Sequence, residues 1–368
     1  RGGELAEILG DQLRSVDSLV VKGNVNDKDF HAMWDASLYG YLSVINLKNA
    51  VLENNAVPDT AFFHENEQYE GSSHEIFYYI GLRKIILREG LEKIGEGAFY
   101  QASALRQVNF PSTLRYIGDF AFNATKLEMN QLVIPEGVEE INQYAFAFCR
   151  KLKAQVTLPS TIKKIGEWAF YGCPITSINL PEGLESLGSL AFWDCDLREV
   201  SIPSSCHEFN EGWQFGFNRN LEKMHLPEGM TEIPDHFAVD SFRLREVNFP
   251  HTLKHIGEKA FSLCISLKNV DLPLGMQSLG EEAFSELEAL EQIVFPASMK
   301  SLGKNSCSYW KNIKRIYCAA MEPPVCDPTD GGVFSGFDFP DGFDTPVVYI
   351  PKGTINKYKD TSRNCMGW

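Results

Sequence analysis

Residues 253–273 read LKHIGEKAFSLCISLKNVDLP, and this stretch decides the fold because its pattern returns along most of the chain. The shared pattern is Leu-x-x-Ile-Gly-x-x-Ala-Phe-x-x-Cys-x-x-Leu-x-x-Val-x-Leu-Pro. The prolines that close its copies follow one another at steps of 24, 24, 22, 22, 24, 23, 23 and 23 residues: Pro111, Pro135, Pro159, Pro181, Pro203, Pro227, Pro250, Pro273 and Pro296. A period of about 20–29 residues is typical of a solenoid, because one unit cannot bury its apolar face and must stack on its neighbours. We therefore predict a repeat solenoid.

The bulk composition fits a continuous core and disfavours several classes of partner. Length alone, 368 residues, favours two or three globular domains, but a solenoid grows by adding units to one core. Apolar residues make up 44% of the chain, which argues against disorder. The formal net charge of −15 opposes binding to nucleic acid or to an anionic membrane surface. No run of about 18 apolar residues occurs, so we predict no membrane span.

Each unit contains two short segments with the pattern of a strand. In the first, residues 197–203, the inward Val200 and Ile202 alternate with polar residues, and the closing proline ends the pairing because it has no N–H. The second segment is Leu-x-x-Ile-Gly, as in residues 114–118. Its glycine indicates either a turn with positive φ or a close approach of two backbones. Asn142 replaces the glycine in one unit, and this favours the turn.

The Ala-Phe pair that follows the glycine predicts a short helical turn whose alanine allows it to approach the core. The phenylalanines of successive units are expected to stack into an aromatic spine inside the solenoid. They are Phe99, Phe122, Phe146, Phe170, Phe192, Phe215, Phe237, Phe261 and Phe284.

Two successive units, residues 204–250, depart from the pattern, and we call them the irregular units. In the first, Asn210 takes the glycine position and Trp213 precedes the Phe of the spine. In the second, Pro234 takes the glycine position and Phe237 arrives one residue early. Either a local kink of the solenoid or a binding feature would account for them.

Four of the nine cysteines share one position of the repeat, three residues after the phenylalanine: Cys149, Cys173, Cys195 and Cys264. Other units place Ala102 or Leu287 there, so the position is apolar and we interpret these cysteines as buried free thiols. A disulfide between neighbouring coils at this position stays open, because adjacent coils bring such residues close. Cys307, at a phenylalanine position, is expected to be buried as well.

The last three cysteines, Cys318, Cys326 and Cys365, lie near the C-terminus, where a pairing also stays open. Because nine is an odd number, at least one thiol is unpaired within the chain.

The repeat divides the chain into three regions. Residues 1–81 are expected to form an N-terminal cap with degenerate first repeats, 82–318 an array of about ten units of ~23 residues, and 319–368 a C-terminal cap. In the first region, 19–23 and 42–47 read as strands, with a helix over 27–38 between them and a polar loop at 65–75. In the last region, 327–346 reads as a long loop, 347–350 as a strand and 354–359 as a short helix.

No catalytic residue, cofactor site or metal site is predicted. Motifs for nucleotide binding or hydrolysis are absent, and His251 and His255 fall on either side of a strand–turn boundary rather than on one face. The acidic loop of residues 327–344 supplies oxygen ligands of the kind that Ca²⁺ prefers. Because its spacing matches no calcium loop, we interpret it as a solvated loop, and ion binding stays an open alternative.

The most promising surface is the set of outward residues beside the inward valines of the first strands, which we call the exposed strand face. On adjacent coils they are expected to form a polar ladder with a step of about 5 Å, and extended solenoid surfaces of this kind bind macromolecules. The candidate binding residues are Gln107, Asn109, Gln155, Thr157, Asn179, Glu199, Ser201, His225, Glu246, Asn248, Asn269 and Asp271.

The repeat resembles the BspA-like class of leucine-rich repeats, with about nine copies over roughly two-thirds of the chain. The closing YIPKG of residues 349–353 and the opening strands at 19–25 and 42–47 are also similar to this family. The resemblance implies a right-handed superhelix of stacked short parallel strands, mostly β with short helical turns. It also implies export, either to the cell surface as an outer-membrane lipoprotein or to the extracellular medium, and adhesion to host or microbial proteins or glycans. It brings no catalytic residues to transfer.

From these observations we expect a non-enzymatic exported binding or adhesion protein whose exposed strand face contacts a protein or glycan. The alternative is a structural spacer or scaffold of the cell surface without a ligand of its own. We expect a monomer without cofactor, nucleic-acid partner or membrane span. The chain begins Arg1-Gly2-Gly3-Glu4 without an initiator Met, which is typical of a mature or trimmed protein and compatible with a lipid anchor upstream.

Overall fold

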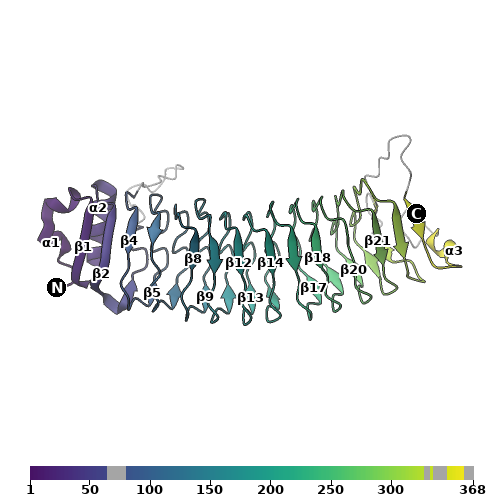
Figure 1. Cartoon of the computed structure of the whole chain (residues 1–368), viewed down its shortest axis with the longest axis horizontal. Coiled ribbons are helices and arrows are strands. Elements are labelled where there is room, and N and C mark those ends of the chain that lie inside the picture. The colour runs from purple at the N-terminus through teal and green to yellow at the C-terminus, as the bar shows by residue number, and fades with distance from the viewer. Residues whose placement is uncertain (64–79, 327–331, 335–345, 360–368) are drawn as a thin grey trace, which may run out of the picture. The chain divides into compact units, whose positions relative to one another are not determined.

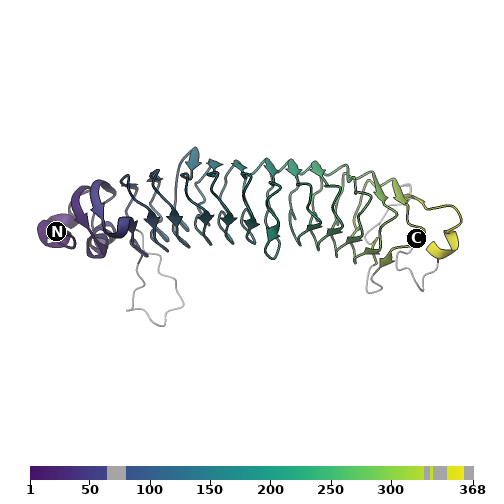
Figure 2. The same ribbon diagram turned by 90° about the horizontal axis from the view of Figure 1, so that it is seen from below.

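The computed structural model describes residues 1–63, 80–326, 332–334 and 346–359. The chain divides into two compact units, unit 1 from Arg1 to Phe192 and unit 2 from Trp193 to Trp368. Each unit is built from stacked coils that carry short parallel strands, so the predicted solenoid is confirmed (Figure 1). Figure 2 shows that the strands of each unit lie in two rows, one from the first and one from the second strand of each coil.

Unit 1 starts with helices packed beside its first strands. Its elements here are α1 (Leu5–Leu9), a 3-10 helix (Gly10–Arg14), β1 (Ser18–Val25), α2 (Asp27–Tyr39), β2 (Val44–Leu52) and a 3-10 turn (Glu53–Asn55). The two strands and the helix predicted for this region are confirmed. A capping box of Asn26 and Asp29 begins α2. The buried Asp29 carboxylate also accepts hydrogen bonds from the backbone N–H of Gly3 (2.6 Å) and Leu5 (3.0 Å), which ties the N-terminus to the helix.

The strands of unit 1 pair only in parallel, coil on coil. The first row holds two sheets, β1-β2-β4-β6 and β8-β10-β12, and the second row runs β3-β5-β7-β9-β11-β13. The remaining bounds are β3 Ala56–Val57, β4 Lys84–Ile86, β5 Lys93–Ile94, β6 Gln107–Val108, β7 Tyr116–Ile117, β8 Gln131–Val133, β9 Glu140–Ile141, β10 Gln155–Thr157, β11 Lys164–Ile165, β12 Ser177–Asn179 and β13 Ser186–Leu187.

Unit 2 repeats this arrangement. Its first row holds the sheets β14-β16-β18 and β21-β23-β25, and its second row holds β17-β19-β20-β22-β24. The bounds are β14 Glu199–Ser201, β15 Glu208–Phe209, β16 Lys223–His225, β17 Glu232–Ile233, β18 Glu246–Asn248, β19 His255–Ile256, β20 Ser278–Leu279, β21 Gln292–Phe295, β22 Ser301–Leu302, β23 Arg315–Cys318, β24 Val325–Cys326, β25 Val347–Tyr349 and α3 Ile355–Tyr358. The predicted strand at 347–350 and helix at 354–359 are confirmed.

The segment after the glycine is a run of β-turns, and the predicted short helical turn is wrong. Residues 118–125 hold Phe120 and Ala124 at φ of 55° and 58°. The N–H of Ala121 bonds within the coil to Gly118, whereas the N–H groups of Phe122 and Ala124 donate to the next coil at 2.8 Å each. A helical turn directs its amides along its own axis, so it would forgo these bonds between coils. The stacking of coils therefore selects the turns.

The repeated glycine is required by a close approach of backbones, and the turn interpretation is wrong. Gly118 is outside the positive-φ region, and a Cβ built on it would lie 2.6 Å from the backbone N of Glu96 on the preceding coil. Asn142 also avoids positive φ. Instead, its side-chain N–H donates to the carbonyl oxygen of Ile117 at 2.5 Å. Asparagine thus fills the position by bonding to the neighbouring backbone.

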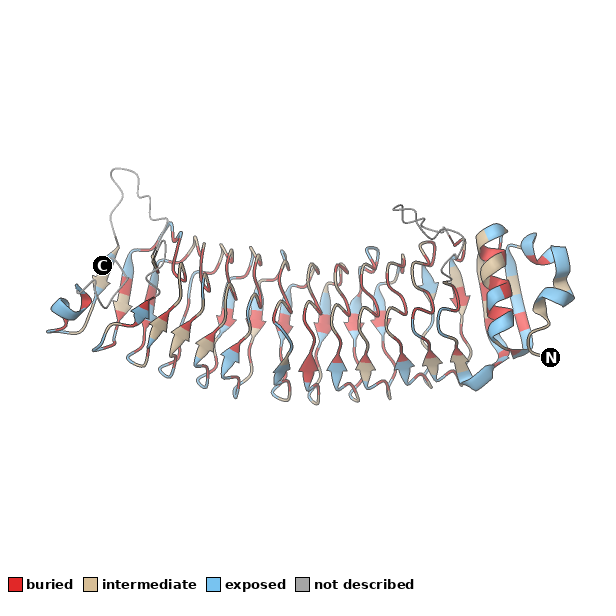
Figure 3. Ribbon diagram, turned by 180° about the vertical axis from the view of Figure 1, so that it is seen from behind, coloured by how far each residue is buried: buried red, intermediate tan, exposed pale blue. Residues whose placement is uncertain are grey.

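The aromatic spine is confirmed in unit 1. Successive rings stack with centroids 5.2–5.6 Å apart and planes within 4–11° of parallel, from Phe99 through Phe122, Phe146 and Phe170 to Phe192. All of these rings are fully buried. Each pair contributes about 0.5–1.5 kcal/mol beyond the burial of area. Figure 3 shows the same buried interior, with buried and exposed residues alternating along the strands.

In unit 2 the spine changes geometry at the irregular units. Phe215 and Phe237 meet edge to face, with planes at 77° and centroids 5.4 Å apart. Further along, Phe261 and Phe284 are again stacked, at 27° and 5.9 Å. The early arrival of Phe237 in the sequence accounts for the change, because it shifts that ring relative to its neighbour.

The eight cysteines in the described part of the chain are free and buried, as predicted for the repeat position; Cys365 lies outside the described residues. The thiols also form hydrogen bonds. Cys149 and Cys173 each donate to the phenylalanine carbonyl of the preceding coil, Phe122 at 3.2 Å and Phe146 at 2.9 Å. Cysteine is therefore favoured at this position over alanine by a bond between coils as well as by packing.

Candidate functional site

In unit 1 the part of the exposed strand face on β8, β10 and β12 is uncharged, with amide and hydroxyl groups and one exposed valine, Val133. β8, β10 and β12 pair in register, so that Gln155 lies between Gln131 and Ser177, and Thr157 lies between Val133 and Asn179. These outward residues are exposed, while the alternate residues Leu132, Val156 and Ile178 are buried in the core. The column repeats at the spacing of neighbouring parallel strands, about 4.8 Å.

The predicted continuous ladder is wrong in extent, because the first row of strands is interrupted. Gln107 and Asn109 are exposed, but β6 does not pair with β8. At this step Glu128, not Gln131, lies beside β6: the Glu128 N–H donates to the Arg106 carbonyl at 2.9 Å. The side chains of β6 thus belong to a separate surface.

Asn109 and Asn248 are exposed candidates whose amides are engaged in bonds between coils. The Asn109 side chain accepts from the N–H of Leu87 (2.7 Å) and donates to the carbonyl of Leu87 (2.9 Å). Asn248 makes the same pair of bonds with Leu226, both at 2.9 Å. Both residues stand in a Val-Asn-Phe-Pro sequence, found at 108–111 and 247–250. That shared tetrapeptide is the signal from which this role could have been predicted.

In unit 2 the exposed strand face is charged, with opposite charges on neighbouring coils. β14, β16 and β18 align Glu199, Lys223 and Glu246 in one column. The Lys223 ammonium lies 3.4 Å from the Glu246 carboxylate, and Nε2 of the half-buried His225 lies 3.2 Å from Glu199. Such exposed pairs contribute little to stability, about 0–1 kcal/mol each.

The other candidates of unit 2 are also exposed. Ser201 lies outward on β14. Asn269 and Asp271 are exposed in a segment of extended chain that is not assigned as a strand. The candidates of unit 2 therefore lie on the coil at 269–271 as well as on the β14-β16-β18 sheet.

A second row of aromatic side chains, which the sequence analysis missed, flanks the turns of unit 1. Phe120 stacks on Tyr144 (4.7 Å, 8°), and Tyr144 stacks on Trp168 (5.3 Å, 13°). These rings are half-buried, and each occupies a residue of positive φ just before the alanine of the turn. Three successive aromatic residues at one repeat position are the signal that could have predicted the row. Because their faces cover one another, only their edges remain for a ligand.

Unit 2 gathers aromatic rings at the same position of its irregular units. The Trp213 indole lies on the His236 imidazole with centroids 3.6 Å apart, and Trp193 contacts both Trp213 and Phe217. Burial lowers the pKa of His236 below its ordinary value of 6.5, so the ring is held neutral. This cluster closes the turn side of the irregular units.

Within the described residues, no group of three or more His, Cys, Asp or Glu side chains is arranged to hold a metal ion. His251 and His255 have different partners, Glu228 at 3.1 Å and Ser278 at 2.7 Å. Most of the acidic loop at 327–344 lies outside the described residues. No helix in the described part of the chain is long and apolar enough to cross a membrane.

Comparisons with known proteins agree with this architecture. Three overlapping stretches, residues 71–155, 153–250 and 231–321, match the sequence profile described as BspA type leucine rich repeat region, in six copies. Together they span more than half of the chain. A sequence comparison with curated proteins found no match.

Among solved structures, a leucine-rich repeat protein from Bacteroides ovatus is 23% identical, with a TM-score of 0.50, over 76% of this chain and 79% of that chain. A leucine rich cell surface protein from Faecalibacterium prausnitzii is 18% identical, with a TM-score of 0.42, over 83% and 88%. The pneumococcal vaccine antigen PcpA is 19% identical, with a TM-score of 0.44, over 96% and 93%. At these identities the likeness concerns the fold alone.

Proposed function

Since the chain belongs to the BspA-type leucine-rich repeat family, we propose that it is a non-enzymatic binding or adhesion protein. It acts at the cell surface or in the extracellular medium, as the family resemblance implies, and its exposed strand face contacts a protein or a glycan. The contact residues are the outward side chains of β8, β10 and β12 in unit 1 and of β14, β16, β18 and the coil at 269–271 in unit 2.

The observation that supports this proposal is the uncharged column of unit 1. The chain carries a net charge of −15, yet the outward residues of the β8-β10-β12 surface are all uncharged: the polar Gln131, Gln155, Thr157, Ser177 and Asn179, and the apolar Val133. Amide side chains both donate and accept hydrogen bonds, which suits sugar hydroxyls and peptide groups alike. A surface free of charge avoids the cost of desolvating ions when a partner covers it.

Charge reversal on unit 2 and charge insertion on unit 1 test the two surfaces separately. In the first variant Glu199, Glu246 and Asp271 are changed to Lys; in the second, Gln131→Lys and Gln155→Lys are combined. Both are measured on a glycan array and on a panel of immobilised extracellular matrix proteins. We expect the variant of the surface that binds to lose about tenfold or more in affinity, because each unpaired buried charge is costly.

The matched control changes exposed acids away from this surface, Asp11, Glu139 and Glu281, to Lys. It produces the same shift in net charge as the first variant, so it separates a local contact from a general electrostatic effect. Binding that both surface variants retain in full would contradict the assignment to the exposed strand face.

A structural spacer without a ligand is the second candidate. The stacked rings of the unit 1 spine and the hydrogen bonds between successive coils favour it, because both stiffen a solenoid against bending. Lack of binding by the unmodified protein to every glycan and matrix protein tested would support the spacer. Specific capture of one ligand would exclude it.

A further inference from the structure

The second row of strands in unit 2 contains a break between β15 and β17, which we call the seam. β17 pairs with β19, but β15 and β17 belong to different sheets and are not hydrogen-bonded to each other. One coil later the usual bonds are present: Lys254 and His255 donate to the carbonyl of Thr231 at 2.9 and 3.2 Å, and Gly257 donates to Ile233 at 2.8 Å. The break is thus confined to one step of the stack.

The irregular sequence explains the seam. On β17 the positions equivalent to Lys254, His255 and Gly257 hold Thr231, Glu232 and Pro234. Thr231 and Glu232 have an N–H to donate, whereas Pro234 has none. Pro234 also takes the position where other coils have the glycine that approaches the preceding coil, as Gly118 approaches Glu96. Among the described residues, the N–H groups of Thr231 and Glu232 have no backbone partner, and neither do the carbonyls of His207 and Phe209. By the pattern of the next coil, the His207 carbonyl would accept from Thr231 and Glu232, and the Phe209 carbonyl would accept from residue 234.

The two coils remain joined on their other sides. β14 and β16 pair in register, from Glu199–Lys223 to Ser201–His225. On the turn side the Trp213 N–H donates to the Asp235 carbonyl at 3.0 Å. The coils are therefore open only along the second row, and the opening is held by bonds on both flanks.

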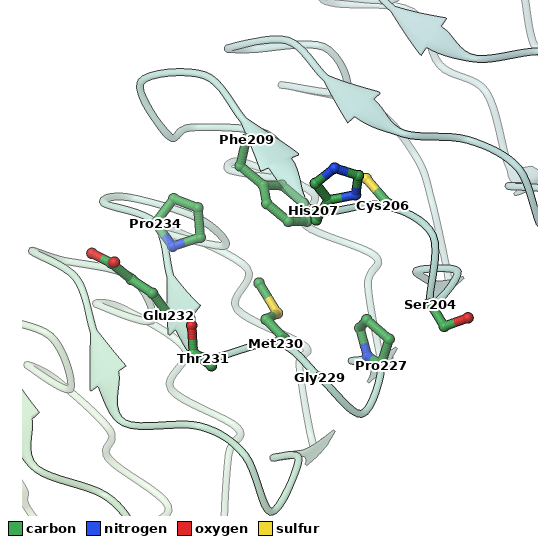
Figure 4. Close-up of a pocket in the computed structure, with 10 residues that line it drawn as sticks. All are labelled: Ser204, Cys206, His207, Phe209, Pro227, Gly229, Met230, Thr231, Glu232 and Pro234. Carbon is green, nitrogen blue, oxygen red and sulfur yellow. The ribbon is translucent and has the colours of Figure 1, made fainter.

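A cavity of about 470 Å³ occupies the seam (Figure 4). Figure 4 shows its lining on two successive coils, with Cys206 and Phe209 on one and Met230 and Pro234 on the other. Cys206 and Met230 are buried, and the Phe209 ring rests edge to face on Phe237 at 5.8 Å. The cavity therefore has an apolar floor and unpaired backbone groups along its two walls.

The rim of the seam is acidic. Glu208 on β15 and Glu232 on β17 are both exposed and occupy equivalent positions of the two strands. Like charges on neighbouring strands are unfavourable. Where the same column is intact in unit 1, a lysine stands beside a glutamate: Lys164 lies 2.8 Å from Glu140. The seam lacks a cation at the corresponding place between its two carboxylates.

We propose that the seam binds an extended segment of a partner protein, which adds a parallel strand between β15 and β17. The carbonyls of this segment accept from Thr231 and Glu232, and its N–H groups donate to His207 and Phe209, two residues apart as a strand requires. Its outward side chain is Lys or Arg, placed between Glu208 and Glu232. Its inward neighbours are apolar and meet Phe209 and Met230. This site lies on the second row and stands independently of the exposed strand face.

The chain itself supplies a suitable probe. Residues 161–166, TIKKIG, contain the equivalent strand of an intact coil, β11, and carry two adjacent lysines flanked by isoleucines. A blocked peptide of this sequence is titrated into the full protein, and binding is followed by calorimetry and by hydrogen exchange of individual amides. We expect saturable binding and slower exchange at Thr231 and Glu232, because the peptide pairs with these amides. Two control peptides are TIEEIG and a TIKKIG analogue with methylated backbone nitrogens.

Charge reversal of the rim tests the assignment without disturbing the core. We expect Glu208→Lys with Glu232→Lys to weaken TIKKIG at least about tenfold and to raise the affinity for TIEEIG. The matched control, Glu139→Lys with Glu281→Lys, should leave both affinities unchanged. Equal binding of the methylated peptide, or protection elsewhere than at the seam, would overturn the proposal, as would absence of binding by the unmodified protein. These outcomes leave the strand-face proposal untouched, because none of its contact residues is altered.

Discussion

The side chain of Asn109 closes a ring of two hydrogen bonds with the backbone of Leu87 on the preceding coil, at 2.7 and 2.9 Å. In unit 2, Asn248 repeats the arrangement on Leu226. In both places the amide takes over the bonding between coils just beyond the end of a strand. These exposed residues therefore have a structural task on a surface that was predicted to be purely for binding.

Removal of this amide is expected to destabilise the coil. Asn109→Ala leaves the N–H and carbonyl of Leu87 without a protein partner, and we expect a loss of about 1–3 kcal/mol. Asn109→Asp keeps the acceptor and loses the donor, so its effect should be smaller. Asn179→Ala, at an exposed residue of the β8-β10-β12 surface, should change stability by less than about 0.5 kcal/mol. Chemical denaturation of the three variants measures this, and equal effects of Asn109→Ala and Asn179→Ala would contradict it.

The Trp213–His236 stack predicts a dependence of stability on pH. Because burial depresses the pKa of His236 in the folded protein, the unfolded chain binds more protons at mildly acidic pH. The contribution of His236 to stability is therefore complete above pH 6.5 and is lost progressively as pH falls through the lower folded-state pKa. The charges that face the ring, Glu258, Lys259 and Asp235, shift it less than burial does.

His236→Phe keeps a ring beside Trp213 and removes the titrating group. We expect the stability difference between this variant and the unmodified protein to grow in favour of the variant as pH falls below 6.5. Thermal denaturation at a series of pH values measures this difference. A difference that does not vary with pH would show that His236 is not protonated on unfolding in this range.

The glycine contacts predict a sharp contrast between two Gly→Ala substitutions. A Cβ at residue 118 would lie 2.6 Å from a backbone nitrogen that cannot move without separating two coils, so Gly118→Ala should destabilise by about 3 kcal/mol or more. At Gly275 the nearest atom is 3.9 Å away, and φ is outside the positive region. Gly275→Ala should therefore be neutral or slightly stabilising. The midpoints of urea denaturation distinguish the two, and similar midpoints would refute the close-approach explanation.

Asp29 is expected to control the order of the N-terminus. Its carboxylate accepts three backbone N–H bonds, from Gly3, Leu5 and Asn26. Asp29→Ala should free residues 1–14 and destabilise the start of α2 by about 3 kcal/mol, since hydrogen bonds to a buried charge are strong. Asp27→Ala, on the exposed first turn of the same helix, should cost less than about 1 kcal/mol. Limited proteolysis and hydrogen exchange of the first 14 residues measure the effect; equal protection in both variants would contradict it.

Much of the architecture could be predicted because it depends on local pattern. The period, the spine from Phe99 to Phe192, the buried cysteine position and the helix at 27–38 all follow from which residues are apolar and how they are spaced. The turn conformation after Gly118 could not be predicted in this way. The amides of this segment donate alternately to carbonyls of their own coil and to carbonyls of the next coil. A short window of sequence does not contain the residues of the next coil.

The exposed strand face was predicted correctly as exposed but not in its extent or its internal bonds. Val-x-Leu-Pro patterns place Gln155 and Thr157 outward whatever the neighbouring coil does. Whether two such strands pair depends on which residue of the next coil lies beside the strand, as Glu128 beside β6 demonstrates. The engagement of Asn109 depends likewise on where Leu87 lies on the neighbouring coil.

The sequence by itself determined the solenoid, because a repeated pattern of buried positions admits only stacking as a way to cover each unit's apolar face. It also located the irregular units, through Asn210, Pro234 and the early Phe237. Only the tertiary structure decided what these residues do. The missing N–H of Pro234 has a consequence because a carbonyl of the preceding coil would otherwise accept a hydrogen bond from it. The two groups are brought together, here between β15 and β17, only when the coils stack.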